Sequence, residues 1–328
     1  MYNIITVGSN TVDVFARTKF SELIKIMKPK GEEDLLAYPS GSKILIEELN
    51  FTTGGGGTNT AVALSRLGHK VAYLGRLGKD ENADFIIKDL KKEKTDLIIS
   101  RGEGCSGYSL ILDSLEHDRT ILTFKGLNDK LKFSEIDLKK LKTKWFYFSS
   151  MMNESFRTLE KLSFYARKNN IKVVFNPSSY LAEKGKDYLK TILSNTEILI
   201  LNKNEAKLLV GLNDINDMLK KLRELGPRIV VITRGKRGVF AFDGKYFYFG
   251  KTNKIKVVET TGAGDAFASS FLSGIIKKNN VEFAIKLGMT NAESVITYHG
   301  AKNKLLRYKE ALKILRKQPI KVKKKKYQ

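Results

Sequence analysis

The sequence has almost no cysteine and no long apolar run. Cys105 is the single cysteine among 328 residues, so no disulfide can form within the chain, which suits a reducing compartment. No stretch approaches the run of apolar residues that a membrane span requires. The apolar run in residues 1–8 is also too short for a secretory signal peptide. We therefore expect a soluble, cytoplasmic protein that does not contact membranes.

Acidic residues are scarce relative to basic ones. The chain has 35 Asp and Glu against 59 Lys and Arg, a formal net charge of +24, and part of the excess lies in a basic tail at residues 319–328. Nucleic-acid binding usually combines such charge with a recognisable reader, and the sequence has neither zinc-ligand spacing nor an aromatic RNA-binding motif. We interpret the excess as solvated surface, with at most loose, non-specific contact between the tail and polyanions.

The rest of the composition is that of an ordinary globular protein. Hydrophobic residues make up 42% of the chain and charged residues 29%, which argues against global disorder. A chain of 328 residues could form one large α/β domain or two smaller ones. Because no internal repeat and no shift in composition marks a linker, we expect one domain over residues 1–328.

Apolar, strand-like runs alternate with helical patterns along most of the chain. The predicted strands are 2–7, 43–49, 70–74, 145–148, 172–175, 198–201, 228–233, 238–243, 245–249 and 255–258. The predicted helices are one opened by the glycine run 54–57 and ended by Gly68, then 83–92, 155–169, 204–210, 214–225, 263–276, 280–298 and 308–317. Such alternation is typical of an α/β fold with a mostly parallel sheet between helices.

Two segments, 14–51 and 105–125, interrupt this alternation. Both contain strand-like runs, including a hairpin at 107–112 and 119–124 across an acidic turn. We expect them to form antiparallel strands that pair with each other. They would make a small sheet inserted into the large domain.

The stretch 259–267 leads from a predicted strand into a helix through Gly262, Ala263 and Gly264. Unpaired N–H groups at a helix N-terminus bind anions, and small residues let a phosphate approach the backbone. Asp265 places a carboxylate where an anion would bind. Two interpretations fit this stretch alone: a general base for a hydroxyl that attacks the phosphate, or a residue that caps the helix.

Three further motifs stand at predicted helix starts or strand ends. The first, from Gly54 to Asn59, is a glycine run that could be only a flexible turn. The second, Asn202 to Glu205, could hold hydrated Mg²⁺ at a strand end or could be an ordinary helix N-terminus. The third, Thr233 to Gly238, suits a nucleotide, and a basic β-turn is the alternative. Each motif is modest by itself.

Together, and in this order, the four motifs closely resemble the ribokinase-like (PfkB) family of carbohydrate and nucleoside kinases. The resemblance covers essentially the whole chain, with the 54–68 and 260–267 stretches matching the two family signatures. It implies a three-layer α/β sandwich with a mostly parallel central sheet and a small β-sheet lid built from 14–51 and 105–125. It also implies transfer of the γ-phosphate of ATP to a hydroxyl, with the lid excluding water.

The resemblance implies a role for each motif residue. Asp265 would be the general base, and the backbone N–H groups of Gly262, Ala263 and Gly264 would form the anion hole. Glu205 would organise Mg²⁺, through water, with Asn202 nearby. The ATP site would comprise Asn202, Thr233, Gly235, Gly238, Gly264 and Asn291. The acceptor site would comprise Asp13, Gly54, Gly55, Asn59 and Asp265.

Departures from the family pattern leave several points open. Glu259 stands where many members have an Asp that helps to bind an activating monovalent cation, so a K⁺ requirement is undecided. Thr11 replaces an Asn of ribose-specific members, which weakens a ribose assignment. The acceptor could be a sugar, or a nucleoside whose base enters a slot made by Phe15, Tyr108 or Phe124. A catalytically idle ligand-binding protein is a third hypothesis, and lids of this family suggest a homodimer.

Overall fold

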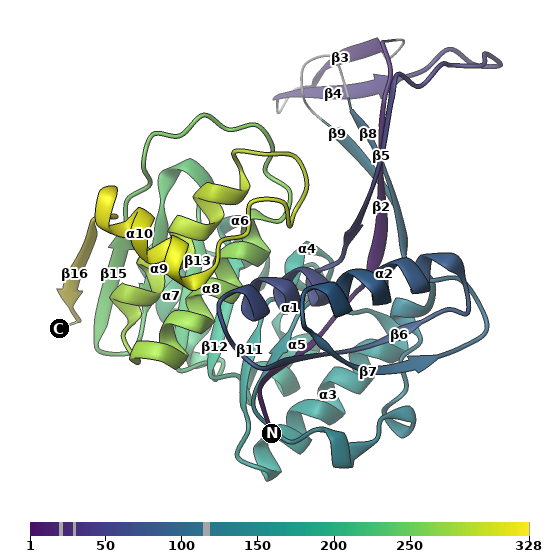
Figure 1. Cartoon of the computed structure of the whole chain (residues 1–328). Helices are drawn as coiled ribbons and strands as arrows, with labels where there is room; N and C mark the ends of the chain where they lie inside the picture. Colours follow the sequence, from purple (N-terminus) through teal and green to yellow (C-terminus); the bar gives the residue numbers. More distant parts are fainter. Residues whose placement is uncertain (20–21, 29–30, 114–118, 328) are drawn as a thin grey trace.

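The centre of the molecule is a ten-stranded sheet with the strand order β16-β15-β14-β13-β12-β11-β10-β1-β6-β7 (Figure 1). This computed structural model describes residues 1–19, 22–28, 31–113 and 119–327. The strands are β1 (Tyr2–Val7), β6 (Val71–Leu77), β7 (Asp96–Arg101), β10 (Thr143–Phe148), β11 (Lys172–Phe175), β12 (Ile198–Asn202), β13 (Ile229–Thr233), β14 (Val239–Phe242), β15 (Tyr246–Gly250) and β16 (Val322–Lys326). Pairing is parallel from β13 to β7 and antiparallel from β13 to β16, which confirms the mostly parallel α/β sheet.

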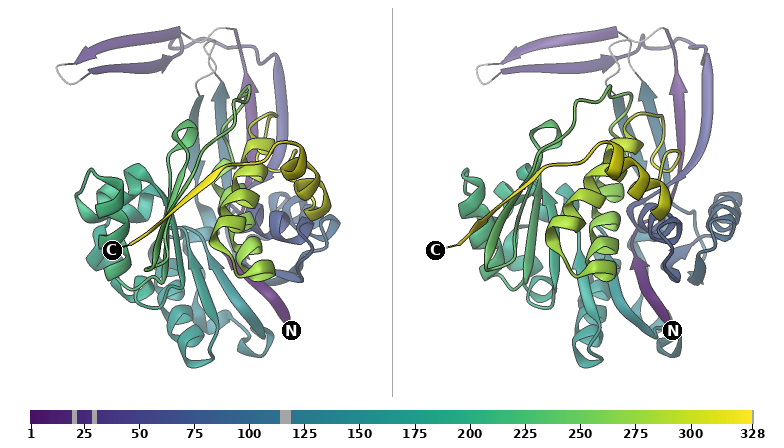
Figure 2. Two further views of the ribbon diagram at one scale, coloured as in Figure 1. Left: turned by 90° about the vertical axis from the view of Figure 1, so that its left-hand side faces the viewer. Right: turned by 60° about the vertical axis from the view of Figure 1, so that its left-hand side comes forward.

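Helices cover both faces of this sheet, as Figures 1 and 2 show. One face packs against α1 (Gly56–Arg66), α2 (Glu81–Lys92), α8 (Ala263–Lys278), α9 (Val281–Val295) and α10 (Tyr308–Lys317). The other packs against α3 (Asn153–Lys168), α4 (Ser178–Ala182), α5 (Gly185–Leu193), α6 (Lys203–Val210) and α7 (Ile215–Glu224). Successive strand residues alternate between the two cores, as Ile4 and Ile5 do, because neighbouring side chains of a strand point to opposite faces.

A second, four-stranded sheet rises from the carboxyl end of β1 and contains the segments predicted to form the lid, the name we keep for it (Figure 2). Its order is β5 (Glu48–Gly54), β2 (Thr11–Arg17), β8 (Tyr108–Asp113) and β9 (Arg119–Phe124). Segments 14–51 and 105–125 therefore do pair, but β2 and β8 run parallel, so the expectation of purely antiparallel strands was wrong. The hairpin β8–β9 is confirmed, and its acidic turn lies outside the described residues.

The long loop between β2 and β5 contains a hairpin of its own. Strands β3 (Glu22–Lys28) and β4 (Gly31–Ala37) pair only with each other among the described strands. The strand predicted at 43–49 instead begins at Glu48, which pairs with Arg17 at the end of β2, and β5 continues to Gly54, opposite Thr11. That register brings the end of the lid strand directly to the start of α1.

Two other segments differ from the prediction. Residues 255–258 form no strand; Ile255 and Val257 line a pocket, and the Val258 N–H donates to the Ile296 carbonyl oxygen at 2.8 Å. The C-terminal segment is not a loose tail, because Val322–Lys326 pairs with β15 as the edge strand of the central sheet. Lysines on an edge strand disfavour pairing with further strands.

No helix in the described ranges has the length and apolarity needed to cross a membrane.

Candidate active site

Helix α8 begins at the carboxyl edge of the sheet with a turn that only glycine fits well. Gly262 has φ 75°, and a Cβ there would lie 2.5 Å from the Ala301 Cβ. A Cβ on Gly264 would meet no atom within 4 Å, so open space lies beside the first turn. The first N–H groups of a helix lack partners within the helix. Gly262, Ala263 and Gly264 thus surround an open, positively polarised helix end.

Asp265 lies in the same first turn, and its side chain faces the N-terminal half of the chain. Its Oδ2 accepts a hydrogen bond from Asn59 Nδ2 at 2.9 Å. Burial raises the pKa of the Asp265 carboxyl to about 6, while Asn59 and Lys302 oppose that rise and Asp13 adds to it. A carboxylate with this pKa can accept a proton near neutral pH.

The predicted acceptor residues converge on this carboxylate from the lid and from α1. Asp13 lies on β2 beside Gly54, where a Cβ would fall 1.8 Å from Asp13 Oδ2, so position 54 requires glycine. Burial raises the pKa of Asp13, although Thr11 and Ser109 hydrogen-bond to it. Gly55, with φ 98°, turns the chain into α1. That helix presents Asn59, whose Oδ1 is buried without a hydrogen-bond partner in the described structure.

A cavity of about 420 Å³ opens on the other side of the α8 N-terminus. Polar and glycine residues at its mouth include Thr233, Gly235, Gly238 and Gly264, which are four of the predicted nucleotide-binding residues. Its apolar walls are formed by Ile255, Val257, Phe267, Met289 and Ile296. Gly235 and Gly238 both have positive φ, and a Cβ on Gly238 would lie 2.3 Å from the Gly250 carbonyl oxygen. The apolar walls suit an adenine ring, and the open α8 end suits phosphates.

Asn291 does not belong to this cavity. It is completely buried, its Nδ2 donates to Ser270 Oγ at 2.7 Å, and its Oδ1 accepts from the Leu306 N–H at 2.9 Å. Both ends of the amide are therefore occupied inside the protein. The structure places Asn291 as a link between α8, α9 and the segment before α10, away from the predicted adenine contact.

Asn202 and Glu205 form a capping box at the start of α6. Asn202 Oδ1 accepts from the Glu205 N–H, and Glu205 Oε2 accepts from the Asn202 N–H, both at 2.9 Å. Asn202 and Glu205 therefore form an ordinary helix N-terminus, which was one of the two interpretations of this motif. Burial raises the pKa of Glu205. Glu205 Oε1 makes only a 3.5 Å contact with Ser179 Oγ, so one oxygen could accept from metal-bound water. In the described chain, no group of three or more His, Cys, Asp or Glu could hold a metal directly.

Glu259 holds the loop that follows α9. Its Oε2 accepts from the Gly300 N–H at 2.8 Å and lies 3.5 Å from His299 Nδ1. The residue contributes negative charge near Asp13, whose pKa it helps to raise. These contacts fix the loop against the start of α8.

Lys302 was not predicted as a site residue, and its side chain is only 11% exposed. Its Nζ donates to Thr53 Oγ1 at 2.5 Å and to Asp89 Oδ2 at 2.9 Å. Its charge lowers the pKa values of both Asp13 and Asp265. Lys302 thus joins the lid strand β5 to α2 and sets the electrostatics of the site. In a lysine-rich sequence no spacing distinguishes it from solvated lysines.

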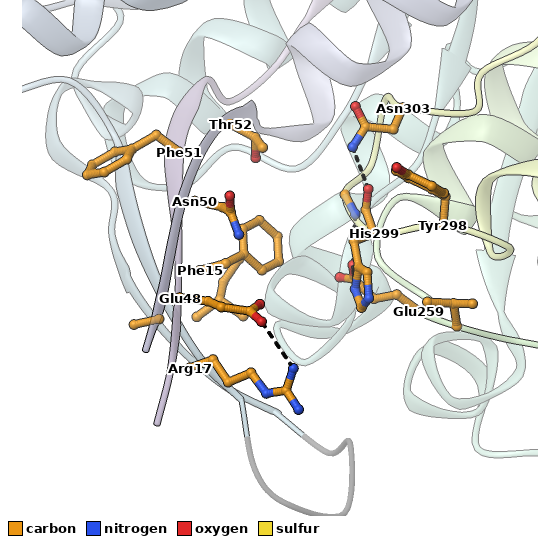
Figure 3. A pocket seen from close by; sticks show the side chains of 14 residues that line it. Phe15, Arg17, Glu48, Asn50, Phe51, Thr52, Glu259, Tyr298, His299 and Asn303 are labelled. Atoms are coloured by element: carbon orange, nitrogen blue, oxygen red, sulfur yellow. Dashed lines mark hydrogen bonds and ion pairs between the residues drawn. The ribbon is translucent and has the colours of Figure 1, made fainter. Parts of the chain in front are cut away.

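A second cavity, of about 370 Å³, lies between the lid and the loop 298–303 (Figure 3). Phe15, Arg17, Glu48, Asn50 and Thr52 line it from β2 and β5, and Tyr298, His299 and Asn303 face them across the gap. Tyr108 and Phe124 are in register with Val12, one residue away from Asp13, and therefore lie on the other face of the lid. Of the three aromatic residues considered for a base slot, only Phe15 lines this cavity.

The structure thus brings together a cavity of about 420 Å³, the open N-terminus of α8, the buried Asp265 carboxylate and a second cavity. Comparisons with known proteins identify the family. The model of the pfkB family carbohydrate kinases matches residues 24–307. A protein from Archaeoglobus fulgidus, described as an uncharacterized sugar kinase, is 33% identical over 257 residues, covering 75% of this chain and 99% of that protein.

Two further relatives broaden the comparison. A cytidine kinase from Thermococcus kodakarensis is 29% identical over 275 residues, covering 81% of this chain and 94% of that protein. An E. coli crystal structure containing ATP and Mg²⁺, assigned to a ribokinase II, superposes with a TM-score of 0.82 at 18% identity, over 97% of this chain and 100% of that one. The chain belongs to the pfkB family of carbohydrate kinases. It is a carbohydrate or nucleoside kinase with the ribokinase fold.

Proposed function

We propose that the protein transfers the γ-phosphate of ATP to a hydroxyl of a sugar or nucleoside, with Asp265 as the general base. The acceptor oxygen would form a bond to the γ-phosphorus while the bond to the β,γ-bridging oxygen breaks, releasing ADP. The acceptor proton would pass to the Asp265 carboxylate. The observation that carries this proposal is the buried Asp265, with a pKa raised to about 6, at the open N-terminus of α8.

The residues at the nucleotide end would bind and orient ATP. The apolar walls of the 420 Å³ cavity would hold the adenine, and the glycines at 235 and 238 would let the chain approach the nucleotide closely. The N–H groups of Gly262, Ala263 and Gly264 would stabilise charge on the transferred phosphoryl group. Bound Mg²⁺ would neutralise phosphate charge, and Glu205 would hold its water ligands.

The residues at the acceptor end would position the attacking hydroxyl. Asp13 would accept hydrogen bonds from neighbouring hydroxyl groups of the substrate. Asn59 would hold Asp265 in place through its Nδ2, while its unpartnered Oδ1 would accept from the substrate. Closure of the lid over the bound acceptor and the phosphates of ATP would exclude water, which would otherwise compete as an acceptor.

Asp265→Asn tests the base assignment, because asparagine keeps the size of the side chain and cannot take the proton. We expect kcat to fall roughly 10³-fold, the scale of general base catalysis, with ATP affinity by calorimetry nearly unchanged. Asp214→Asn is the matched control, since Asp214 is the N-cap of α7, lines neither cavity, and asparagine caps helices equally well. Turnover near wild type in Asp265→Asn would exclude this residue as the base.

A ligand-binding protein without catalysis is the competing hypothesis. It requires no residue able to accept a proton, and the raised pKa of the buried Asp265 therefore argues against it. Absence of ADP formation over a broad panel of sugars and nucleosides, together with measurable binding of one of them, would favour that alternative.

We also propose a homodimer through the lid. Leu49, Phe51, Leu122 and Phe124 on its outer face are between 49% and 57% exposed, a row of apolar side chains that a second copy could cover. Sedimentation of the wild type should show a dimer, and Leu122→Glu should shift it toward the monomer. A wild type that sediments as a monomer at micromolar concentration would refute the proposal.

A further inference from the structure

The register of the lid strands divides the wall of the 370 Å³ cavity into three successive levels. Nearest the α8 N-terminus, Asp13 is paired with Thr52. Two residues further out, Phe15 is paired with Asn50, and two further still, Arg17 with Glu48. Paired residues share one face of a sheet, so all six side chains belong to one face of the lid, and all of them except Asp13 line the cavity (Figure 3). Each level has a different chemistry.

The innermost level is suited to hydroxyl groups. Asp13 hydrogen-bonds with Thr11 and Ser109, and it lies close enough to Asp265 and Lys302 to share their electrostatic field. A polyol held there would present one hydroxyl to Asp265.

The second level is suited to a flat ring. Phe15 is half-buried, and Ile111, its register partner on β8, is 3% exposed, so together they form an apolar shelf. Asn50 lies beside this shelf with its amide group in the cavity (Figure 3). Tyr298 and His299 close the opposite side. An aromatic shelf with an adjacent amide is what a nucleobase requires: stacking for its face and hydrogen bonds for its edge.

The spacing distinguishes this from a site for a free sugar. Two strand residues span roughly 6.6 Å, so the Phe15 level lies one ring beyond the Asp13 level. A single pentose at Asp13 would leave the aromatic shelf and its amide uncovered. A ribose carrying a base would cover both levels.

The charge of the cavity also argues against a phosphorylated acceptor. Its lining contains two carboxylates, Glu48 and Glu259, and one guanidinium, that of Arg17. Arg17 Nη1 lies 3.5 Å from Glu48 Oε1, so a carboxylate already accompanies the one guanidinium charge. Among the residues that the structure describes, no lysine lines the cavity, although the chain carries 59 Lys and Arg. A site for a sugar phosphate would need free cations here.

We propose that the acceptor is a nucleoside, with its ribose at Asp13 and its base stacked on Phe15, where Asn50 reads the edge of the base. This inference rests on the proposed phosphotransfer at Asp265. It adds that the second level of the lid, rather than the sugar-binding level, selects the substrate.

The experiment compares ribose with cytidine, uridine, adenosine, inosine and guanosine in wild type, Phe15→Leu and Phe164→Leu. Phe15→Leu keeps an apolar side chain and removes stacking, while Phe164→Leu makes the same change at an exposed aromatic on α3, outside both the lid and the cavity. Steady-state ADP release gives kcat/KM for each acceptor. Calorimetry without ATP measures nucleoside binding independently of turnover.

We expect the best nucleoside to exceed ribose at least 100-fold in kcat/KM. Phe15→Leu should lower that value, and nucleoside affinity, about tenfold, as loss of base stacking does, without changing kcat/KM for ribose. Phe164→Leu should change neither. The nucleoside proposal is overturned if ribose matches the best nucleoside, or if no nucleoside binds. Nucleoside binding that depends on Phe15 without any ADP formation would support this site and refute the phosphotransfer instead.

Discussion

Asn59 and Asp265 are 206 positions apart in the sequence, and a 2.9 Å hydrogen bond joins them. Each lies in the first turns of a helix that leaves a glycine-rich loop, α1 in one case and α8 in the other. Their contact joins the acceptor half of the site to the phosphate half. Because Asn59 donates this hydrogen bond to the carboxylate, it also lowers the pKa of Asp265, the proposed base.

The pH dependence of kcat/KM should report this arrangement. Because burial raises the pKa of Asp265 to about 6, activity should be constant above about pH 7 and fall tenfold per unit well below 6. Asn59 lowers that pKa, so Asn59→Ala should move the acidic limb to higher pH. An acidic limb near the ordinary Asp value of 3.8 in the wild type would contradict the assignment.

The same pKa predicts a stability effect. A carboxyl whose pKa is higher in the folded protein than in the unfolded chain favours folding below the unfolded value of 3.8, and this contribution is lost as the pH rises through about 6. At pH 8 the ionised Asp265 therefore costs on the order of 3 kcal/mol. Asp265→Asn should be more stable than wild type at pH 8 and lose that advantage near pH 4 in urea titrations. If Asp265→Asn and wild type had the same free energy of unfolding at pH 8 and at pH 4, this prediction would be contradicted.

Lys302 should matter for stability and for catalysis. Lys302→Met would leave Asp89 and Thr53 without their cation, and we expect a loss of about 2 kcal/mol, somewhat below that of a completely buried pair. It should also raise the pKa of Asp265 and shift the acidic limb upward. Lys309→Met is the control, because Lys309 is an exposed lysine on α10. Urea unfolding and pH–rate profiles separate the two effects.

Two glycines of α8 should respond in opposite ways to alanine. At Gly264 a Cβ meets open space, so Gly264→Ala should keep or slightly raise stability, by up to about 1 kcal/mol, while its methyl group hinders phosphate and raises the KM for ATP. At Gly274 a Cβ would lie 2.6 Å from the Ala284 Cα, so Gly274→Ala should lower the thermal midpoint and leave the KM for ATP unchanged. An unchanged KM in Gly264→Ala would argue against phosphate at this helix end.

The C-terminal segment should behave as part of the fold. Ile320 is 2% exposed and Val322–Lys326 pairs with β15, so removing residues 319–328 should cost about 2 kcal/mol or more. Combined Lys323→Gln and Lys325→Gln changes keep the strand and remove exposed charge. They should leave stability unchanged and only weaken salt-dependent retention on heparin. Unchanged stability in the truncated chain would show that β16 contributes little.

The sequence predicted the parallel sheet because its strands are continuous apolar runs, as at residues 172–175, and its helices have clear starts and ends. It could not predict β16, since a run of lysines has no apolar pattern, and its position follows from the free edge of β15. It also predicted a strand at 255–258, where apolar residues line a pocket and do not pair with a neighbouring strand. Apolar character alone does not reveal which partner a segment finds.

By itself, the sequence determined the glycine turns and the carboxylate at position 265, because local backbone geometry restricts which residues fit there. Tertiary structure decided which side chains reach that carboxylate. It brought Lys302 between Thr53 and Asp89, and it turned Phe15 toward the cavity while turning Phe124 away. It also buried Asn291 with both ends of its amide satisfied. These outcomes depend on strand register and on contacts between distant segments, which no local pattern encodes.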